Sequence, residues 1–452
     1  MQRIIFPWET RKWAKIVDKI NEPMLNIVDL DARISCLSAN NPTPVKIKQI
    51  TGILETYFSD TQYEKDRPSK DLFINKIIPY LQALVCAGPR VFKGFKSFTL
   101  APNVSTNILV NRPQAATLIA CMWFGLFDYN YLSSGNAGIN DYPEPTLLKI
   151  WDNPNLFGLQ CIINYFVRVY KYTSAEVDEQ DRFEAGNIIL KRHVLVKEPD
   201  WIGSNLPITE SYIGDGTVDN VKTKMHVAYA HDIIGGDLFC RAFSQEEIIL
   251  LVRPECLISL LFCARMGPME SVTILGAEKM SEYVGYGSSA RMVGNYVDQC
   301  ELGYNPDSTE VMYQTSVIFI DACKKTASRS QFIDDFDRDL TKAYCGFTAL
   351  TFSKPGTQIA SGAWSYGFNG CNLQLKCIQQ ILAASQANKC IVYCPPGCEF
   401  EDRLYPFLSW LKHAALTVGE LYIRYVDILR DSGTGPNARL DCLDLFSLLM
   451  DS

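Results

Sequence analysis

The sequence lacks several features that would assign it directly to a class of protein. It has no excess of positive charge, because 43 Lys and Arg residues face 50 Asp and Glu residues, for a net charge of −7. Direct nucleic-acid binding is therefore not expected, although backbone amides can still bind phosphates. The most apolar stretch, residues 117–127, is too short to cross a bilayer and predicts a core helix, so no membrane partner is expected either.

A zinc motif and a secretory signal are also missing from the sequence. Cys390, Cys394 and Cys398 are the most closely spaced of the 16 cysteines, but no further His or Cys pair completes a four-ligand site. The segment MQRIIFPWETRKWAK, residues 1–15, carries charge throughout and has no apolar core. We therefore expect no cofactor, and an intracellular location in the cytoplasm or the nucleus.

The sequence does contain a change of pattern part-way along its length. Apolar residues first recur at helical spacing, and later short β-rich runs alternate with helical stretches, which indicates an α/β or α+β sheet covered by helices. We predict a helical N-terminal region (1–185), a sheet-containing region (186–430), and a linker with a C-terminal helix (431–452). The predicted helices are 44–58, 70–87, 112–128, 145–171, 245–266, 329–346, 372–387 and 401–428, and the predicted strands are NIILKRHVLV, MHVAYAHDII, SVTILGA, SVIFIDA and KCIVYC.

Three segments contain candidate site residues, and each also has an ordinary structural explanation. Residues 226–255 are predicted to form a strand that ends at a Gly-Gly turn and leads to QEE at the start of an apolar helix. Acidic residues in a first helical turn, and glycines in a turn, are common without any function. Residues 274–289 offer tyrosines among glycines, which can stack on a base or simply pack. Residues 361–372 form a Gly-rich segment before a helix, which can hold phosphates or be a plain loop.

Taken together, these segments resemble the catalytic region of the poly(ADP-ribose) glycohydrolases. That family pairs a GGG turn with a downstream QEE at the spacing found here. The resemblance extends over roughly residues 110–425. It implies an α+β fold, in which a macrodomain-like mixed sheet flanked by helices follows a helical N-terminal region. The other matching segments are RPQAATLIACMWFGLF (112–127), SEYVGYG (281–287), LTKAYCGF (340–347) and GAWSYGFNG (362–370).

The resemblance also implies an activity and roles for particular residues. The family hydrolyses the ribose–ribose O-glycosidic bonds of poly(ADP-ribose) and releases ADP-ribose, so polymer and product are the expected partners. Glu247 is implied as the catalytic acid and Glu246 as the residue that positions the ribose. Gln245 is placed near the adenine and Tyr286 is placed to stack on it. The remaining implied ligand contacts are Gly235, Gly236, His231, Gly367, Phe368 and Asn369.

Several positions depart from the family pattern where ligand contacts are expected. Ala228 replaces an aspartate, His231 an asparagine that binds ribose, and Asp237 the third glycine of the turn. Ala363 replaces an asparagine of the Gly-rich segment, and Pro396 stands where an aromatic residue is expected. Three hypotheses follow: an active glycohydrolase, a non-catalytic macrodomain protein that kept the scaffold, or an enzyme for another ADP-ribosyl or nucleotide-like ligand.

Overall fold

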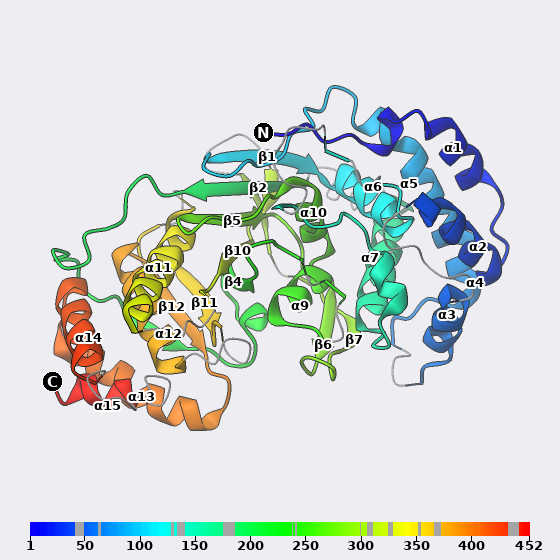
Figure 1. The fold of residues 1–452 in the computed structure, drawn as a ribbon. Coiled ribbons are helices and arrows are strands. Elements are labelled where there is room, and N and C mark those ends of the chain that lie inside the picture. Colours follow the sequence, from blue (N-terminus) through cyan, green and yellow to red (C-terminus); the bar gives the residue numbers. More distant parts are fainter. Residues whose placement is uncertain are drawn as a thin grey trace.

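The structure is a computed structural model. It describes the chain except for residues 41–48, 62–64, 128–130, 133–140, 175–185, 237, 240–241, 299, 305–310, 324–328, 351–353, 366–371 and 433–442. Within the described part, an eight-stranded sheet lies between two groups of helices, one formed by the N-terminal helices together with residues 245–262 and one formed by helices that follow residue 328 (Figure 1).

The bounds of the helices and strands are as follows. The helices are α1 Trp13–Asn21, α2 Ile27–Leu37, α3 Gln49–Ser59, α4 Lys70–Leu72, α5 Ile78–Val91, α6 Arg112–Trp123, α7 Phe157–Ser174, α9 Gln245–Val252, α10 Ser259–Phe262, α11 Arg329–Thr348, α12 Leu373–Gln386, α13 Cys398–Ala414, α14 Val418–Ser432 and α15 Leu445–Met450. The strands are β1 Thr106–Asn111, β2 Asn187–Val194, β3 Ser211–Ile213, β4 Met225–Ala230, β5 Glu270–Leu275, β6 Ser281–Val284, β7 Arg291–Asn295, β8 Leu302–Tyr304, β9 Val311–Tyr313, β10 Ser316–Asp321, β11 Gln358–Gly362 and β12 Cys390–Cys394. Short 3-10 segments include η5 Leu148–Asp152, η6 Val218–Asn220 and η7 Pro254–Ile258, and a π-helical turn, Phe73–Ile77, joins α4 to α5.

The large sheet is mixed, with the strand order β1-β2-β5-β10-β4-β11-β12-β3. The strands β1, β2, β5 and β10 pair antiparallel, whereas β10, β4, β11, β12 and β3 pair parallel. The carboxyl ends of β4, β10, β11 and β12 therefore meet at one edge. Open α/β sheets bind ligands at such an edge, because the loops that leave adjacent parallel strands converge there.

Successive side chains along the central strands pack alternately into two separate hydrophobic cores. On β4, Ala228 belongs to the core shared with the N-terminal helices, α9 and α10, whereas Val227 belongs to the core shared with α11 to α15. On β10, Phe319 and Ile318 divide in the same way. This period of two is what a sheet covered on both faces requires.

The N-terminal region is helical, as predicted, with one departure. Residues Thr106–Asn111 form β1, which pairs with β2 and so extends the large sheet to an edge strand outside the region predicted to hold it. The segment Lys70–Val91 is long and apolar enough to cross a membrane by length and composition. Its residues Ile78, Leu81 and Val85 are buried in the N-terminal core, and 39% of its apolar stretch is buried.

Three predicted helices are divided in the structure. The stretch 245–266 consists of α9, the 3-10 segment η7 and α10, because Arg253 leaves the helical conformation before Pro254. The stretch 401–428 is divided into α13 and α14, because Ala415 adopts a left-handed conformation with φ 49°. The stretch 145–171 contains η5 before α7, which begins only at Phe157. The five predicted strands correspond to β2, β4, β5, β10 and β12, and α6 begins at Arg112 after the cap Asn111, next to Pro113 as predicted.

Candidate active site

The predicted acid, Glu247, is fixed at the start of α9 by a reciprocal cap. The Oγ of Ser244 accepts from the backbone N of Glu247 at 3.4 Å, and the backbone N of Ser244 donates to Oε2 of Glu247 at 2.7 Å. This capping box holds the carboxylate over the positive end of the helix. Glu247 is only 4% exposed, so its carboxyl group lies outside bulk water.

Glu246 connects the loop after β4 to the start of α9. Its Oε2 accepts from the backbone N of His231 at 2.9 Å and from Nδ1 of the same residue at 3.0 Å, and its Oε1 accepts from the backbone N of Gly235 at 2.8 Å. Glu246 is 1% exposed. Both of its oxygens are thus engaged by the protein itself. The predicted contact of Glu246 with a ribose stays a prediction. In the structure, His231 donates to Glu246, and its predicted contact with the ligand also stays a prediction.

Gln245 completes the hydrogen bonding of β4 where a neighbouring strand stops. The strand β11 pairs with β4 only as far as His226. Beyond that point, Oε1 of Gln245 accepts from the backbone N of Tyr229, and Nε2 donates to the carbonyl oxygen of Val227, both at 2.8 Å. The amide takes the place of a strand backbone. It therefore fixes α9 against β4, and its predicted contact with adenine stays a prediction.

Tyr286 has its hydroxyl group at the start of α9 and its ring in solvent. The hydroxyl oxygen accepts from the backbone N of Gln245 at 3.0 Å, whereas the residue as a whole is 59% exposed. Burial of the hydroxyl end and the nearby charge of Glu247 raise the pKa of Tyr286, although the hydrogen bond from Gln245 opposes them. The ring is available for the predicted stacking on a base, and the hydroxyl group supports the helix that carries Glu247.

The two glycines of the turn have different surroundings. Gly235 is buried with φ 69°, and a Cβ there would lie 2.6 Å from Cδ2 of Leu260. This glycine is required by its left-handed conformation and by packing. Gly236 is exposed and has an ordinary φ, so it is the one whose backbone a ligand can approach. Phe239, in the same loop, has φ 66°, a conformation that is strained for a bulky residue and is often found near functional sites.

The structure describes the two ends of the Gly-rich segment 361–372, which are residues 361–365 and Asn372. At the first end, a Cβ on Gly362 would lie 2.5 Å from the carbonyl oxygen of Cys394. Trp364 is buried, and Nζ of Lys376 lies 4.7 Å from its ring centroid. At the other end, Asn372 caps α12. The predicted contacts Gly367, Phe368 and Asn369, and the departure Asp237, lie outside the described residues.

The other departures from the family pattern differ in exposure. Ala228 is fully buried in the core on the α9 side of β4. Ala363 is partly buried, and Pro396 is exposed after β12. Ala228 belongs to β4, Ala363 follows β11 and Pro396 follows β12, and their proximity to a ligand stays a prediction.

A buried ionic network, which the sequence did not reveal, joins the helical region to the site. Nε of Arg112 donates to Glu255 at 2.7 Å, and its Nη2 donates to Glu278 at 2.9 Å. Glu278 also accepts from Arg168 at 3.0 Å. The network links α6 and α7 to η7, directly after α9, and to the chain after β5. Because its partners lie more than 100 positions apart in the sequence, no local motif reveals it.

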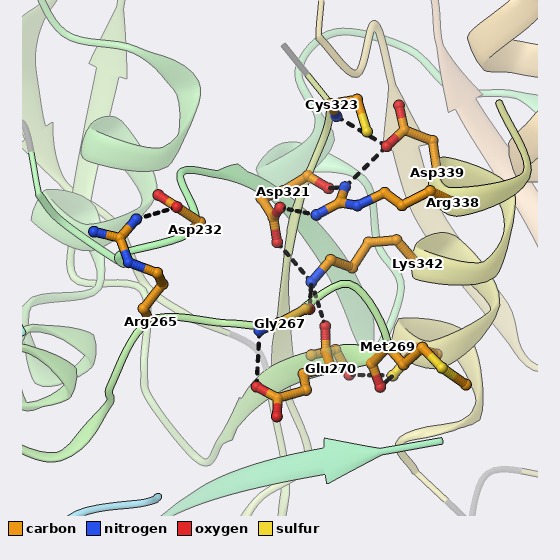
Figure 2. Close-up of polar contacts among 12 residues, drawn as sticks. Asp232, Arg265, Gly267, Met269, Glu270, Asp321, Cys323, Arg338, Asp339 and Lys342 are labelled. Atoms are coloured by element: carbon orange, nitrogen blue, oxygen red, sulfur yellow. Dashed lines mark hydrogen bonds and ion pairs between the residues drawn. The ribbon is translucent and has the colours of Figure 1, made fainter. Parts of the chain in front are cut away.

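A second ionic cluster holds the end of β10 beside β4 (Figure 2). Nζ of Lys342 lies 2.6 Å from Oδ1 of Asp321 and donates to the carbonyl oxygens of Gly267 and Glu270, also at 2.6 Å. Burial lowers the pKa of Lys342, and Asp321 partly offsets that shift. Arg338 pairs with Asp321 from the same helix, α11. The segment 340–347 resembles the family in sequence, but nothing in its sequence predicts this role of Lys342.

Comparisons with known proteins agree with this geometry. The helical-domain model of poly(ADP-ribose) glycohydrolase matches residues 65–192, and the macro-domain model of the same enzyme matches residues 198–401. The chain belongs to the poly(ADP-ribose) glycohydrolase family. Its α+β fold, a macro domain preceded by a helical domain, is confirmed. The boundary predicted at residue 185 stays a prediction.

Curated relatives carry the name of the same enzyme. The probable poly(ADP-ribose) glycohydrolase 2 of Arabidopsis thaliana is 24% identical over 84% of this chain and 82% of its own length. The poly(ADP-ribose) glycohydrolase 1 of the same plant is 27% identical over 62% of this chain and 52% of its own length. The poly(ADP-ribose) glycohydrolase 1 of Caenorhabditis elegans is 26% identical over 48% of this chain, which spans 29% of that relative.

Proposed function

We propose that the protein hydrolyses ribose–ribose O-glycosidic bonds of poly(ADP-ribose) and releases ADP-ribose. The observation that carries this proposal is the position of Glu247, which is held by the cap of α9, next to Glu246, whose oxygens are bound by the loop that follows β4. Family membership supplies the substrate class. The neighbouring Glu246, Gln245 and Tyr286 all make contacts that hold α9 in this place.

The proposed chemistry uses one carboxyl group twice. Glu247 donates its proton to the leaving ribose oxygen while the bond from that oxygen to the anomeric carbon breaks, and positive charge develops on the remaining sugar. The resulting carboxylate then takes a proton from a water molecule, whose oxygen attacks the anomeric carbon. ADP-ribose leaves with the new hydroxyl group, and Glu247 is protonated again.

A second candidate function is that of a non-catalytic protein that binds ADP-ribose. It is favoured by the contacts of Glu246, whose two oxygens are both engaged by His231 and Gly235 rather than turned toward a sugar. The charge of Asp237 does not separate the two functions, because a carboxylate beside a diphosphate repels it and weakens binding in either case.

A combined turnover and binding assay separates the two functions. The natural protein is incubated with poly(ADP-ribose), released ADP-ribose is quantified, and binding of ADP-ribose is measured by calorimetry. We expect the natural protein to release ADP-ribose and to bind it weakly. The Asp237→Gly variant should bind ADP-ribose more tightly. The gain in affinity should be larger at low ionic strength, because the repulsion that the substitution removes is less screened there. Binding without any release supports the non-catalytic function, and absence of both contradicts the two functions alike.

We also propose an intracellular location, in the cytoplasm or the nucleus. The described cysteines support it, because they are free thiols and several of them, including Cys121, Cys161 and Cys377, are buried as small apolar side chains. Localisation of the tagged protein by microscopy tests this proposal, and a secreted protein would contradict it.

A further inference from the structure

The residues just before α7 reach from the helical domain to the loop that carries Tyr286. Asn155 lies within the helical-domain match, and the tyrosine loop, which we define as residues 285–290, lies within the macro-domain match. This loop joins β6 to β7, and α7 lies against both strands (Figure 1). We propose that Asn155 is a positioning residue, which holds the tyrosine loop so that the ring of Tyr286 is placed for the ligand. The role of that ring rests on the proposed function.

The side-chain amide of Asn155 forms hydrogen bonds through both of its ends. Its Nδ2 donates to the carbonyl oxygen of Ser288 at 3.0 Å and to that of Ala290 at 3.1 Å. Its Oδ1 accepts from the backbone N of Phe157, the first residue of α7, at 2.9 Å. Because a backbone N–H can only donate, this last bond fixes which end of the amide is the oxygen. Asn155 therefore ties the start of α7 to the tyrosine loop.

Ser289 connects the two carbonyl groups held by Asn155 to the backbone of Tyr286. It stands between Ser288 and Ala290 in the sequence. Its Oγ accepts from the backbone N of Tyr286 at 3.1 Å and donates to the carbonyl oxygen of Tyr286 at 2.8 Å. Its backbone N donates to the same carbonyl oxygen at 3.1 Å. A shift of the segment that Asn155 holds is therefore passed directly to Tyr286.

The backbone on both sides of Tyr286 is permissive, so hydrogen bonds have to hold it. Gly285 has φ 80° and Gly287 has φ 61°, and glycine populates such conformations without steric cost. Packing of the ring does not fix Tyr286 either, because the residue is 59% exposed. A ring that occupies its binding position only part of the time lowers the apparent affinity by that fraction. The bonds from Asn155 therefore bear on affinity for the ligand as well as on the order of the loop.

The test uses the full chain with Asn155→Asp as the central variant. Aspartate keeps an acceptor for the backbone N of Phe157, but it turns a carboxylate toward the two carbonyl oxygens in place of the donors. We expect faster hydrogen exchange at the amides of residues 287–290 and a rise of about three- to tenfold in Kd for ADP-ribose and in KM. The Tm should stay almost unchanged, because the start of α7 keeps its acceptor. The kcat should change less than KM, because Ser244 still caps the helix of Glu247.

Three further variants test whether Asn155 acts through Tyr286. Asn155→Ala removes the two donors without adding a charge, so a rise in Kd shared with Asn155→Asp does not come from repulsion of the phosphates. Asn26→Ala removes the asparagine that caps α2, and it should lower Tm without changing Kd. In a Tyr286→Leu background, Asn155→Asp should cause no further rise in Kd, because the ring that Asn155 positions is already gone.

Three results would overturn the inference. The first is an Asn155→Asp protein whose exchange at residues 287–290, or whose Kd, equals that of the natural protein. The second is a rise in Kd that is as large in the Tyr286→Leu background as in the natural protein, because Asn155 would then act on another part of the site. The third is an equal rise in Asn26→Ala, which would make the effect one of stability alone. If the natural protein binds no ADP-ribose, the proposed function fails instead, and the exchange measurement alone decides whether Asn155 holds the tyrosine loop.

Discussion

Tyr286 performs two tasks that belong to different atoms of one side chain. Its hydroxyl group accepts a hydrogen bond from the first residue of α9, and its ring is exposed beside that helix. We predict that Tyr286→Phe lowers kcat about two- to tenfold with KM nearly unchanged, because one hydrogen bond of about 1 kcal/mol that holds the helix of Glu247 is lost while the ring remains. Tyr286→Leu should raise KM as well, because it removes the stacking surface.

Steady-state kinetics of both variants on poly(ADP-ribose) check this division of roles. Tyr304→Phe is the matched control, because Tyr304 is also strongly exposed and lies on β8. It should behave as the natural protein does. A Tyr286→Phe variant that raises KM and leaves kcat intact would mean that the hydroxyl group contacts the ligand rather than supporting α9.

Among the helices and strands, those with strong local patterns were predictable. The strands β2, β4, β5, β10 and β12 are rich in β-branched residues, and α9 begins at QEE as its cap and acidic first turn indicate. The strands β1 and β11 were not predicted. The sequence of β11, QIASG, has little β propensity, and its position is imposed by pairing with β12 and β4.

The same limit applies to the candidate site. Its acidic pair, its turn and its tyrosine were found because they lie in short motifs with recognisable spacing. The contacts that orient them were not, because the amide of Gln245 binds β4 from 16 and 18 positions away and Tyr286 reaches α9 from 41 positions away. Resemblance to a family suggests which residues take part. Only the folded structure shows that the side chains of Glu246 and Gln245 form hydrogen bonds with the protein's own backbone.

The parallel strands of the sheet lie between two hydrophobic cores, so a titratable residue on a central strand is buried. Burial of such a residue makes the stability of the fold depend on pH. His226, on the central strand β4, is fully buried near Arg253, and burial together with that charge lowers the pKa of His226 to about 4. The unfolded chain binds a proton to this residue below about pH 6.5, whereas the folded chain does so only near pH 4. Its contribution to stability is therefore complete above pH 6.5 and is lost as the pH falls toward 4.

We expect the free energy of unfolding to fall by about 2 kcal/mol between pH 6.5 and pH 5 through this residue. Urea denaturation at several pH values in that interval measures the slope, before most carboxylates titrate. In a His226→Gln variant the slope should be smaller, and in His413→Gln, on the exposed end of α13, it should be unchanged. An equal slope in the natural protein and the His226→Gln variant would show that another group is responsible.

We propose Glu247, on α9, as the acid of a poly(ADP-ribose) hydrolase. Replacement by glutamine keeps the shape of the side chain but removes the proton that the leaving ribose oxygen requires. The most direct measurement is therefore single-turnover release of ADP-ribose by the natural protein and by Glu247→Gln, with Kd for ADP-ribose and Tm determined on the same samples. We expect a loss in rate of about 10²- to 10⁴-fold with Kd and Tm almost unchanged. A variant that keeps most of the natural rate would contradict it, because the acid would then be another residue.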